Sequence, residues 1–175
     1  MQNQRPMRVA IVGLGTVGIG VIKLLDANRD LIARRAGRPI EVHAVNARDR
    51  DRDRGGDISR FDWVDDIMEL ATRDDIDVVV ELIGGSDGPS LALARAALGA
   101  GKPLVTANKA MLAHHGLALA ELAEKSGIPL KYEAAVAGGR PRSKQVAGRG
   151  AARRARGERG RPGRAGGGHR APGRL

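Results

Sequence analysis

Three glycines in the pattern G-x-G-x-x-G constrain the fold of this chain more than any other feature. An apolar run, residues 8–12 (RVAIV), precedes them, and residues 18–25 (GIGVIKLL), with apolar positions at helical spacing, follow. A strand that turns through glycines into a helix directs the free N–H groups of the helix start at one spot, which suits the phosphates of a dinucleotide. Glycines that serve only the turn are the alternative, but the flanking strand and helix favour cofactor binding. The candidate cofactor-binding residues of the turn are Gly13, Gly15, Thr16, Val17 and Gly18.

Each glycine of this motif has a separate expected role. Gly13 permits the tight turn, and Gly15 lets the backbone approach a pyrophosphate. Gly18 lets the helix pack closely on the strand.

Strand and helix patterns alternate along the chain as far as residue 133. Apolar or alternating runs predict strands at residues 8–12, 40–45, 76–83, 103–106 and 128–133. Helical spacing predicts helices at residues 18–25, 67–71, 91–100 and 117–125, and the charged segment 48–60 predicts an exposed loop. Strands that alternate with helices form parallel sheets with right-handed crossovers. We therefore expect an α/β, Rossmann-type doubly wound parallel sheet, forming one NAD(P)-binding domain over residues 1–139.

The residues after the second predicted strand bear on the choice between NADP and NAD. An NAD-binding domain usually places a carboxylate there for the ribose hydroxyls. Here the strand ends in Val45-Asn46-Ala47-Arg48, with no carboxylate before Asp49. The planar guanidinium of Arg48 can pair with the 2′-phosphate of NADP. The pattern favours NADP, with NAD possible and a solvated loop arginine as the alternative.

Positive charge is confined to the end of the chain. Residues 1–139 carry 18 Lys and Arg against 19 Asp and Glu, whereas residues 140–175 carry 12 against 1. Arg, Gly, Ala and Pro dominate residues 140–175, which contain too few apolar residues to form a core, so we expect a disordered basic tail. A shifted reading frame in GC-rich DNA is a second hypothesis for this tail. The chain has no cysteine, no signal-peptide pattern and no apolar run long enough to span a bilayer, which predicts a soluble cytoplasmic protein without disulfides.

Three further segments resemble one enzyme family. They are residues 81–85 (ELIGG), 105–109 (VTANK) and 133–139 (EAAVAGG). Together with the glycine loop they have the order and spacing found in homoserine dehydrogenase, and the resemblance runs over residues 8–139. It implies the NADPH-dependent reduction of L-aspartate 4-semialdehyde to L-homoserine, a step of threonine and methionine biosynthesis, by an enzyme that is a homodimer.

The resemblance also implies roles for particular residues. Lys109 lies where the family has a lysine at the junction of nicotinamide and substrate, and Thr106 lies beside the cofactor. From the residues alone, Lys109 follows a strand at the carboxyl edge of the sheet and could stabilise a developing alkoxide, with an exposed helix-start lysine as the alternative. The family binds a monovalent cation such as Na⁺ at positions that match Glu133, Val136 and Gly138. Adjacent residues of a helix point apart, so we expect His114 and His115 to be surface residues rather than a metal pair.

The resemblance ends at Gly139. The family continues with an apolar Ile-Pro type segment and a substrate domain, whereas this chain continues Arg140-Pro141-Arg142. We therefore expect a truncated, inactive fragment. A Rossmann module with a basic nucleic-acid-binding arm is one alternative, although the tail has no aromatic residues for stacking on bases. Another NADP-dependent dehydrogenase, of the aspartate dehydrogenase or dihydrodipicolinate reductase type, is the other.

Overall fold

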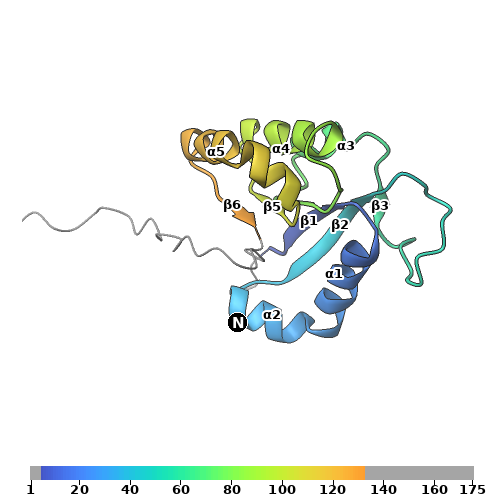
Figure 1. The fold of residues 1–175 in the computed structure, drawn as a ribbon. Coiled ribbons are helices and arrows are strands. Elements are labelled where there is room, and N and C mark those ends of the chain that lie inside the picture. The colour runs from blue at the N-terminus through green and yellow to red at the C-terminus, as the bar shows by residue number, and fades with distance from the viewer. Residues whose placement is uncertain (1–4, 133–175) are drawn as a thin grey trace, which may run out of the picture. The chain divides into compact units, whose positions relative to one another are not determined.

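The computed structural model describes residues 5–132, in which six parallel strands form one sheet with helices on both faces (Figure 1). The strands are β1 (Met7–Val12), β2 (Ile40–Asn46), β3 (Asp62–Trp63), β4 (Val78–Glu81), β5 (Leu104–Thr106) and β6 (Leu130–Tyr132). The helices are α1 (Thr16–Ala27), α2 (Arg29–Ala36), α3 (Ile67–Thr72), α4 (Pro89–Gly99) and α5 (Lys109–Ser126). The strand order is β3-β2-β1-β4-β5-β6, so the predicted Rossmann-type α/β fold is confirmed.

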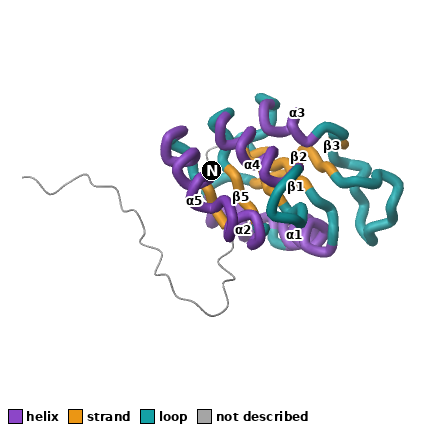
Figure 2. Tube along the Cα trace, turned by 45° about the horizontal axis from the view of Figure 1, so that its top comes forward, coloured by secondary structure: helices purple, strands orange, loops and turns teal. Residues whose placement is uncertain are grey.

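Alternating side chains of the central strands fill two separate cores. Ala10 and Val12 of β1 point to one face, where α3, α4 and α5 cover the sheet (Figures 1 and 2). Val9 and Ile11 point to the other face and pack with Ile19 of α1. Because successive residues of a strand point to opposite faces, a strand buried on both sides must be apolar throughout, as residues 8–12 nearly are.

The strands end in register along one edge of the sheet. Val12 of β1 pairs with Asn46 of β2 on one side and with Glu81 of β4 on the other. Glu81 pairs with Thr106 of β5, which in turn pairs with Tyr132 of β6. The residues that follow these strand ends therefore lie along a single edge. Strands β2 and β3 are added on one side of β1, and β4, β5 and β6 are added on its other side, so the strand order reverses between β1 and β4.

Two elements of the structure were not predicted. Helix α2 lies in a segment for which no element was expected, and it has no buried residue. Strand β3 has only two residues, which pair with β2 at the outer edge of the sheet. An amphipathic pattern cannot reveal a helix without an apolar face or a strand of two residues.

The predicted start of the helix at residue 117 was wrong. Helix α5 begins eight residues earlier, at Lys109, because the side chain of Asn108 accepts a hydrogen bond from the Met111 N–H (3.0 Å) and caps the first turn. The strand predicted at 76–83 is shorter in the structure, where β4 comprises only Val78–Glu81.

The helices of residues 5–132 include none that is long and apolar enough to cross a membrane.

Candidate functional site

The candidate site lies at the carboxyl edge of the sheet, between the ends of β1 and β4. The connection from β1 leads to α1 on one face, and the connection from β4 leads to α4 on the opposite face (Figure 1). Two connections that depart to opposite faces leave a crevice between them, and open α/β sheets bind their ligands in such a crevice.

The glycine loop meets the β4 loop in direct backbone contact. Gly13 has a φ of +102°, and a Cβ added there would lie 2.6 Å from the carbonyl oxygen of Leu82. A Cβ at Gly18 would lie 2.1 Å from the carbonyl oxygen of Gly13. Both positions therefore require glycine for backbone packing.

Gly15 differs from the other two glycines of the motif. A Cβ added at Gly15 would meet no atom within 4 Å. Gly15 is the N-cap of α1 and provides no side-chain cap, and Thr16 and Val17 of the first turn are exposed. The N–H groups of the helix start thus face open space, an arrangement that fits the pyrophosphate of a dinucleotide.

A buried carboxyl group lies on the other side of the crevice. Glu81, the last residue of β4, is fully buried, and its Oε1 accepts a hydrogen bond from the Ile83 N–H (2.7 Å). The hydroxyl of Thr106 donates to Oε2 (2.5 Å). Burial raises the pKa of Glu81, although hydrogen bonds from Thr106, the Ile83 N–H and Asn108 act in the opposite direction.

Asn108 connects this carboxyl group to the start of α5. Its backbone N–H donates to the hydroxyl of Thr106 (3.0 Å), and its side-chain amide donates to the carbonyl oxygens of Ile83 (3.0 Å) and Gly85 (2.7 Å). No role of Glu81 or Asn108 was predicted from the sequence. A carboxylate inside the apolar run 76–83 was the available signal for Glu81, and an Asn directly before a helix was the signal for Asn108.

Lys109 is the first residue of α5 and is exposed at this edge, three residues after the buried Thr106. His115 lies further along α5, where its Nε2 is 2.7 Å from a carboxylate oxygen of Asp87 in the loop before α4. The Ser86 hydroxyl and His115 lower the pKa of Asp87. His114 is exposed as expected, whereas His115 is partly buried.

Arginines gather in the loop that follows β2. Arg48 is exposed, and no ion pair holds it within residues 5–132. The guanidinium groups of Arg50 and Arg54 lie over the ring of Trp63, at 5.7 and 5.8 Å from its centroid. Arg48 therefore differs from these two neighbours in having no aromatic contact within the described residues.

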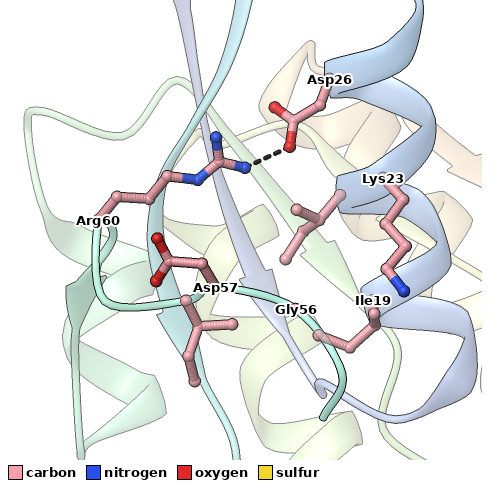
Figure 3. Close-up of a pocket in the computed structure, with 8 residues that line it drawn as sticks. Ile19, Lys23, Asp26, Gly56, Asp57 and Arg60 are labelled. Atoms are coloured by element: carbon pink, nitrogen blue, oxygen red, sulfur yellow. Dashed lines mark hydrogen bonds and ion pairs between the residues drawn. The ribbon is translucent and has the colours of Figure 1, made fainter.

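Two of the cavities along α1 differ in their lining. One, of about 230 Å³, lies between α1 and residues 56–60, where Lys23 and the ion pair of Asp26 with Arg60 line it (Figure 3). It includes none of the predicted site residues. The other, of about 520 Å³, is an apolar groove along α1 and strands β1, β4, β5 and β6, and it includes Val17 and Thr106.

The predicted cation site belongs to the part of the chain after Tyr132. Glu133, Val136 and Gly138 lie outside the described residues. Within residues 5–132, no three His, Asp or Glu side chains gather in a way that could hold a metal ion.

The fold and the crevice define a dinucleotide-binding Rossmann domain. A family model described as the NAD binding domain of homoserine dehydrogenase matches residues 13–133. The chain therefore belongs to the homoserine dehydrogenase family, which confirms the resemblance seen in the sequence.

Individual relatives agree with this assignment. Homoserine dehydrogenase of Corynebacterium glutamicum is 42% identical over 133 residues, covering 76% of this chain and 29% of the relative. That of Pseudomonas aeruginosa is 45% identical over 144 residues, covering 81% and 32%. The crystal structure of a homoserine dehydrogenase from Thiobacillus denitrificans superposes with a TM-score of 0.71 at 38% identity, covering 79% of this chain and 32% of that one. The chain thus spans about a third of the length of these relatives.

Proposed function

We propose that this chain is the NADP-binding part of a homoserine dehydrogenase that reduces L-aspartate 4-semialdehyde to L-homoserine with NADPH. The observation that carries the proposal is the glycine loop. Gly13 and Gly18 are fixed by backbone contacts, whereas Gly15 leaves the helix start open, at the crevice of a domain that belongs to this family. The proposal includes a cytoplasmic location and assembly into a homodimer.

The residues of the crevice have distinct proposed roles. The loop of Gly13, Gly15, Thr16, Val17 and Gly18 binds the pyrophosphate through N–H groups at the positive end of α1. The cofactor, when bound, supplies the hydride. Thr106 is assigned to the nicotinamide end of the site, and the exposed ammonium of Lys109 is assigned the role of stabilising negative charge that develops on the substrate oxygen.

A monovalent cation such as Na⁺ is proposed at Glu133, Val136 and Gly138. A carboxylate and carbonyl oxygens are suitable ligands for a hard cation. Binding of Na⁺ or K⁺ by the chain, and its loss in Glu133→Gln, would support this assignment.

The chain alone is proposed to bind the cofactor without turnover. It spans about a third of its relatives' length, and the substrate that exchanges a hydride with the cofactor must be held by further residues if hydride transfer is to occur. Incubation with NADP and homoserine should therefore produce no NADPH absorbance.

The choice of NADP over NAD is proposed to depend on Arg48. This arginine lies two residues beyond β2 at the carboxyl edge, with its guanidinium in no ion pair of residues 5–132. A charge-assisted, bidentate pair with the 2′-phosphate would discriminate against a ribose that carries only hydroxyls.

Fluorescence titration of the 175-residue chain with NADPH and with NADH tests the proposal. We expect tighter binding of NADPH, and a loss of about tenfold or more in NADPH affinity for Arg48→Ala, with NADH affinity unchanged. Arg35→Ala is the matched control, because Arg35 is an exposed arginine in the last turn of α2. No binding of either cofactor by the wild type would contradict the proposed function, and an equal loss in both variants would contradict the role of Arg48.

A further inference from the structure

Glu81 is a fully buried carboxyl group at the point where the strand order reverses. No ion pair of residues 5–132 includes it, so within the described structure its contacts are hydrogen bonds rather than salt bridges. Burying a carboxyl group without a cationic partner costs free energy, and burial raises the pKa of Glu81 accordingly. A side chain kept only for packing would be apolar in such a place.

The hydrogen bonds of Glu81 have a defined direction. The hydroxyl of Thr106 accepts from the Asn108 N–H (3.0 Å), which leaves its own hydrogen for Glu81 Oε2 (2.5 Å). The other carboxylate oxygen accepts from the Ile83 N–H (2.7 Å). One carboxyl group thus connects the loop after β4 to the turn after β5.

The same loop is held from its other side. The amide of Asn108 donates to the carbonyl oxygens of Ile83 and Gly85, so Ile83 is bound at both its N–H and its carbonyl group. The preceding residue, Leu82, is the one whose carbonyl oxygen lies against Gly13. Residues 82–85 therefore form the side of the crevice that faces the glycine loop.

We propose that Glu81 is a positioning residue of the cofactor site, which holds residues 82–85 against the glycine loop and, through Thr106 and Asn108, fixes the start of α5 where Lys109 lies. The inference rests on the proposed function for the identity of the ligand, NADPH. It assigns Glu81 no contact with the cofactor or the substrate.

Two substitutions separate this role from a contribution to packing alone. In Glu81→Met an apolar side chain of similar length fills the space without accepting a hydrogen bond. In Glu81→Gln the amide oxygen can still accept from the Ile83 N–H, and the amide NH2 can donate to the second lone pair of the Thr106 hydroxyl once that hydroxyl turns its own hydrogen away. Val79→Ala is the matched control, because Val79 is fully buried in the same strand and packs in the core on the side of α3, α4 and α5.

The test compares NADPH affinity, melting temperature and amide hydrogen exchange in the 175-residue chain. We expect Glu81→Met to bind NADPH about tenfold more weakly and to exchange the Ile83 amide faster, since this partly buried N–H loses its acceptor. Glu81→Gln should remain within about threefold of the wild type. Val79→Ala should melt at a lower temperature while its NADPH affinity and its Ile83 exchange stay unchanged.

Several outcomes would overturn the inference. Wild-type NADPH affinity in Glu81→Met would do so, and so would a loss in Glu81→Gln as large as that in Glu81→Met, because hydrogen bonding would then not be the cause. Exchange at Ile83 needs no cofactor, so an unchanged rate in Glu81→Met would refute the positioning role by itself. Failure of the wild type to bind NADPH would instead refute the proposed function.

Discussion

Substituting alanine for Gly15 and for Gly18 separates cofactor binding from folding at two positions of one motif. The Cβ of Gly18→Ala would lie 2.1 Å from the Gly13 carbonyl oxygen, and real Cβ contacts essentially never fall below 3.0 Å. The backbone must therefore move by roughly 1 Å, at a cost of about 1–3 kcal/mol, the range observed for overpacked sites. The better helix propensity of alanine returns about 1 kcal/mol.

We therefore expect a net loss of about 0–2 kcal/mol, centred on 1 kcal/mol, for Gly18→Ala. For a domain of this size, that loss lowers the melting temperature by about 5 °C. Gly15→Ala meets no atom within 4 Å, and its backbone (φ −78°, ψ −165°) is accessible to any residue. A slightly poorer N-cap and a less flexible unfolded chain offset one another within about 0.5 kcal/mol.

For NADPH affinity, Gly15→Ala should be the variant with the large effect. The methyl group of Gly15→Ala occupies the open space in front of the α1 N–H groups, so NADPH binding should weaken about tenfold or more as phosphate hydrogen bonds are lost. Thermal unfolding by circular dichroism and fluorescence titration with NADPH measure the two quantities on the same sample. A Gly15→Ala chain that melts as low as Gly18→Ala, or that binds NADPH as the wild type does, would refute this reasoning.

Two further predictions concern stability away from the crevice. The guanidinium of Arg73, 2.6 Å from Asp75, holds the pKa of that carboxyl well below its usual range. The contribution of the ionised Asp75 to the free energy of unfolding is therefore fully present above the unfolded pKa of about 4, and it is lost as pH falls through the folded pKa. Asp75→Asn should cost about 1 kcal/mol at pH 7, a value reduced for solvent screening of a side chain that is 35% exposed. Urea unfolding should show the difference from the wild type narrowing as pH falls below the unfolded pKa of about 4. Asp66 caps α3 by accepting a hydrogen bond from the Met68 N–H (2.9 Å), so Asp66→Ala should lower the free energy of unfolding by about 1 kcal/mol in the same assay. Asp74→Ala is the control, because Asp74 is exposed, and it should cost less than half of that. A pH-independent effect of Asp75→Asn, or equal losses in the two alanine variants, would contradict these assignments.

The elements with a strong apolar pattern could be predicted from the sequence, and the others depend on signals of a different kind. Helix α2 has no buried residue, yet Asp30 in its first turn and Arg34 and Arg35 in its last turn complement the helix dipole. Gly37 ends it in the left-handed conformation, with a φ of +77°. Charge placement and a terminal glycine were therefore the available evidence for this helix.

The candidate site was predictable on one side of the crevice only. Glycines in a fixed spacing identify the β1 loop without knowledge of anything else in the fold. Glu81, Thr106 and Asn108 are distant from it in sequence, and their hydrogen bonds form only when β4 and β5 pair in the observed register. A network that depends on strand register cannot be derived from local residue patterns.

The two sides of the crevice are held by different interactions, and the two loops therefore differ in their sensitivity to pH. The β1 loop is fixed by steric contact of Gly13 with the Leu82 carbonyl group, a constraint that is insensitive to protonation. The β4 loop is fixed by a carboxyl group whose folded pKa is raised by burial, so its ionisation as pH rises is opposed by the fold. Since Leu82 directly follows Glu81, the two constraints meet at one backbone segment. A change at Gly13 or at Glu81 therefore moves the Leu82 backbone, and the width of the crevice depends on both residues.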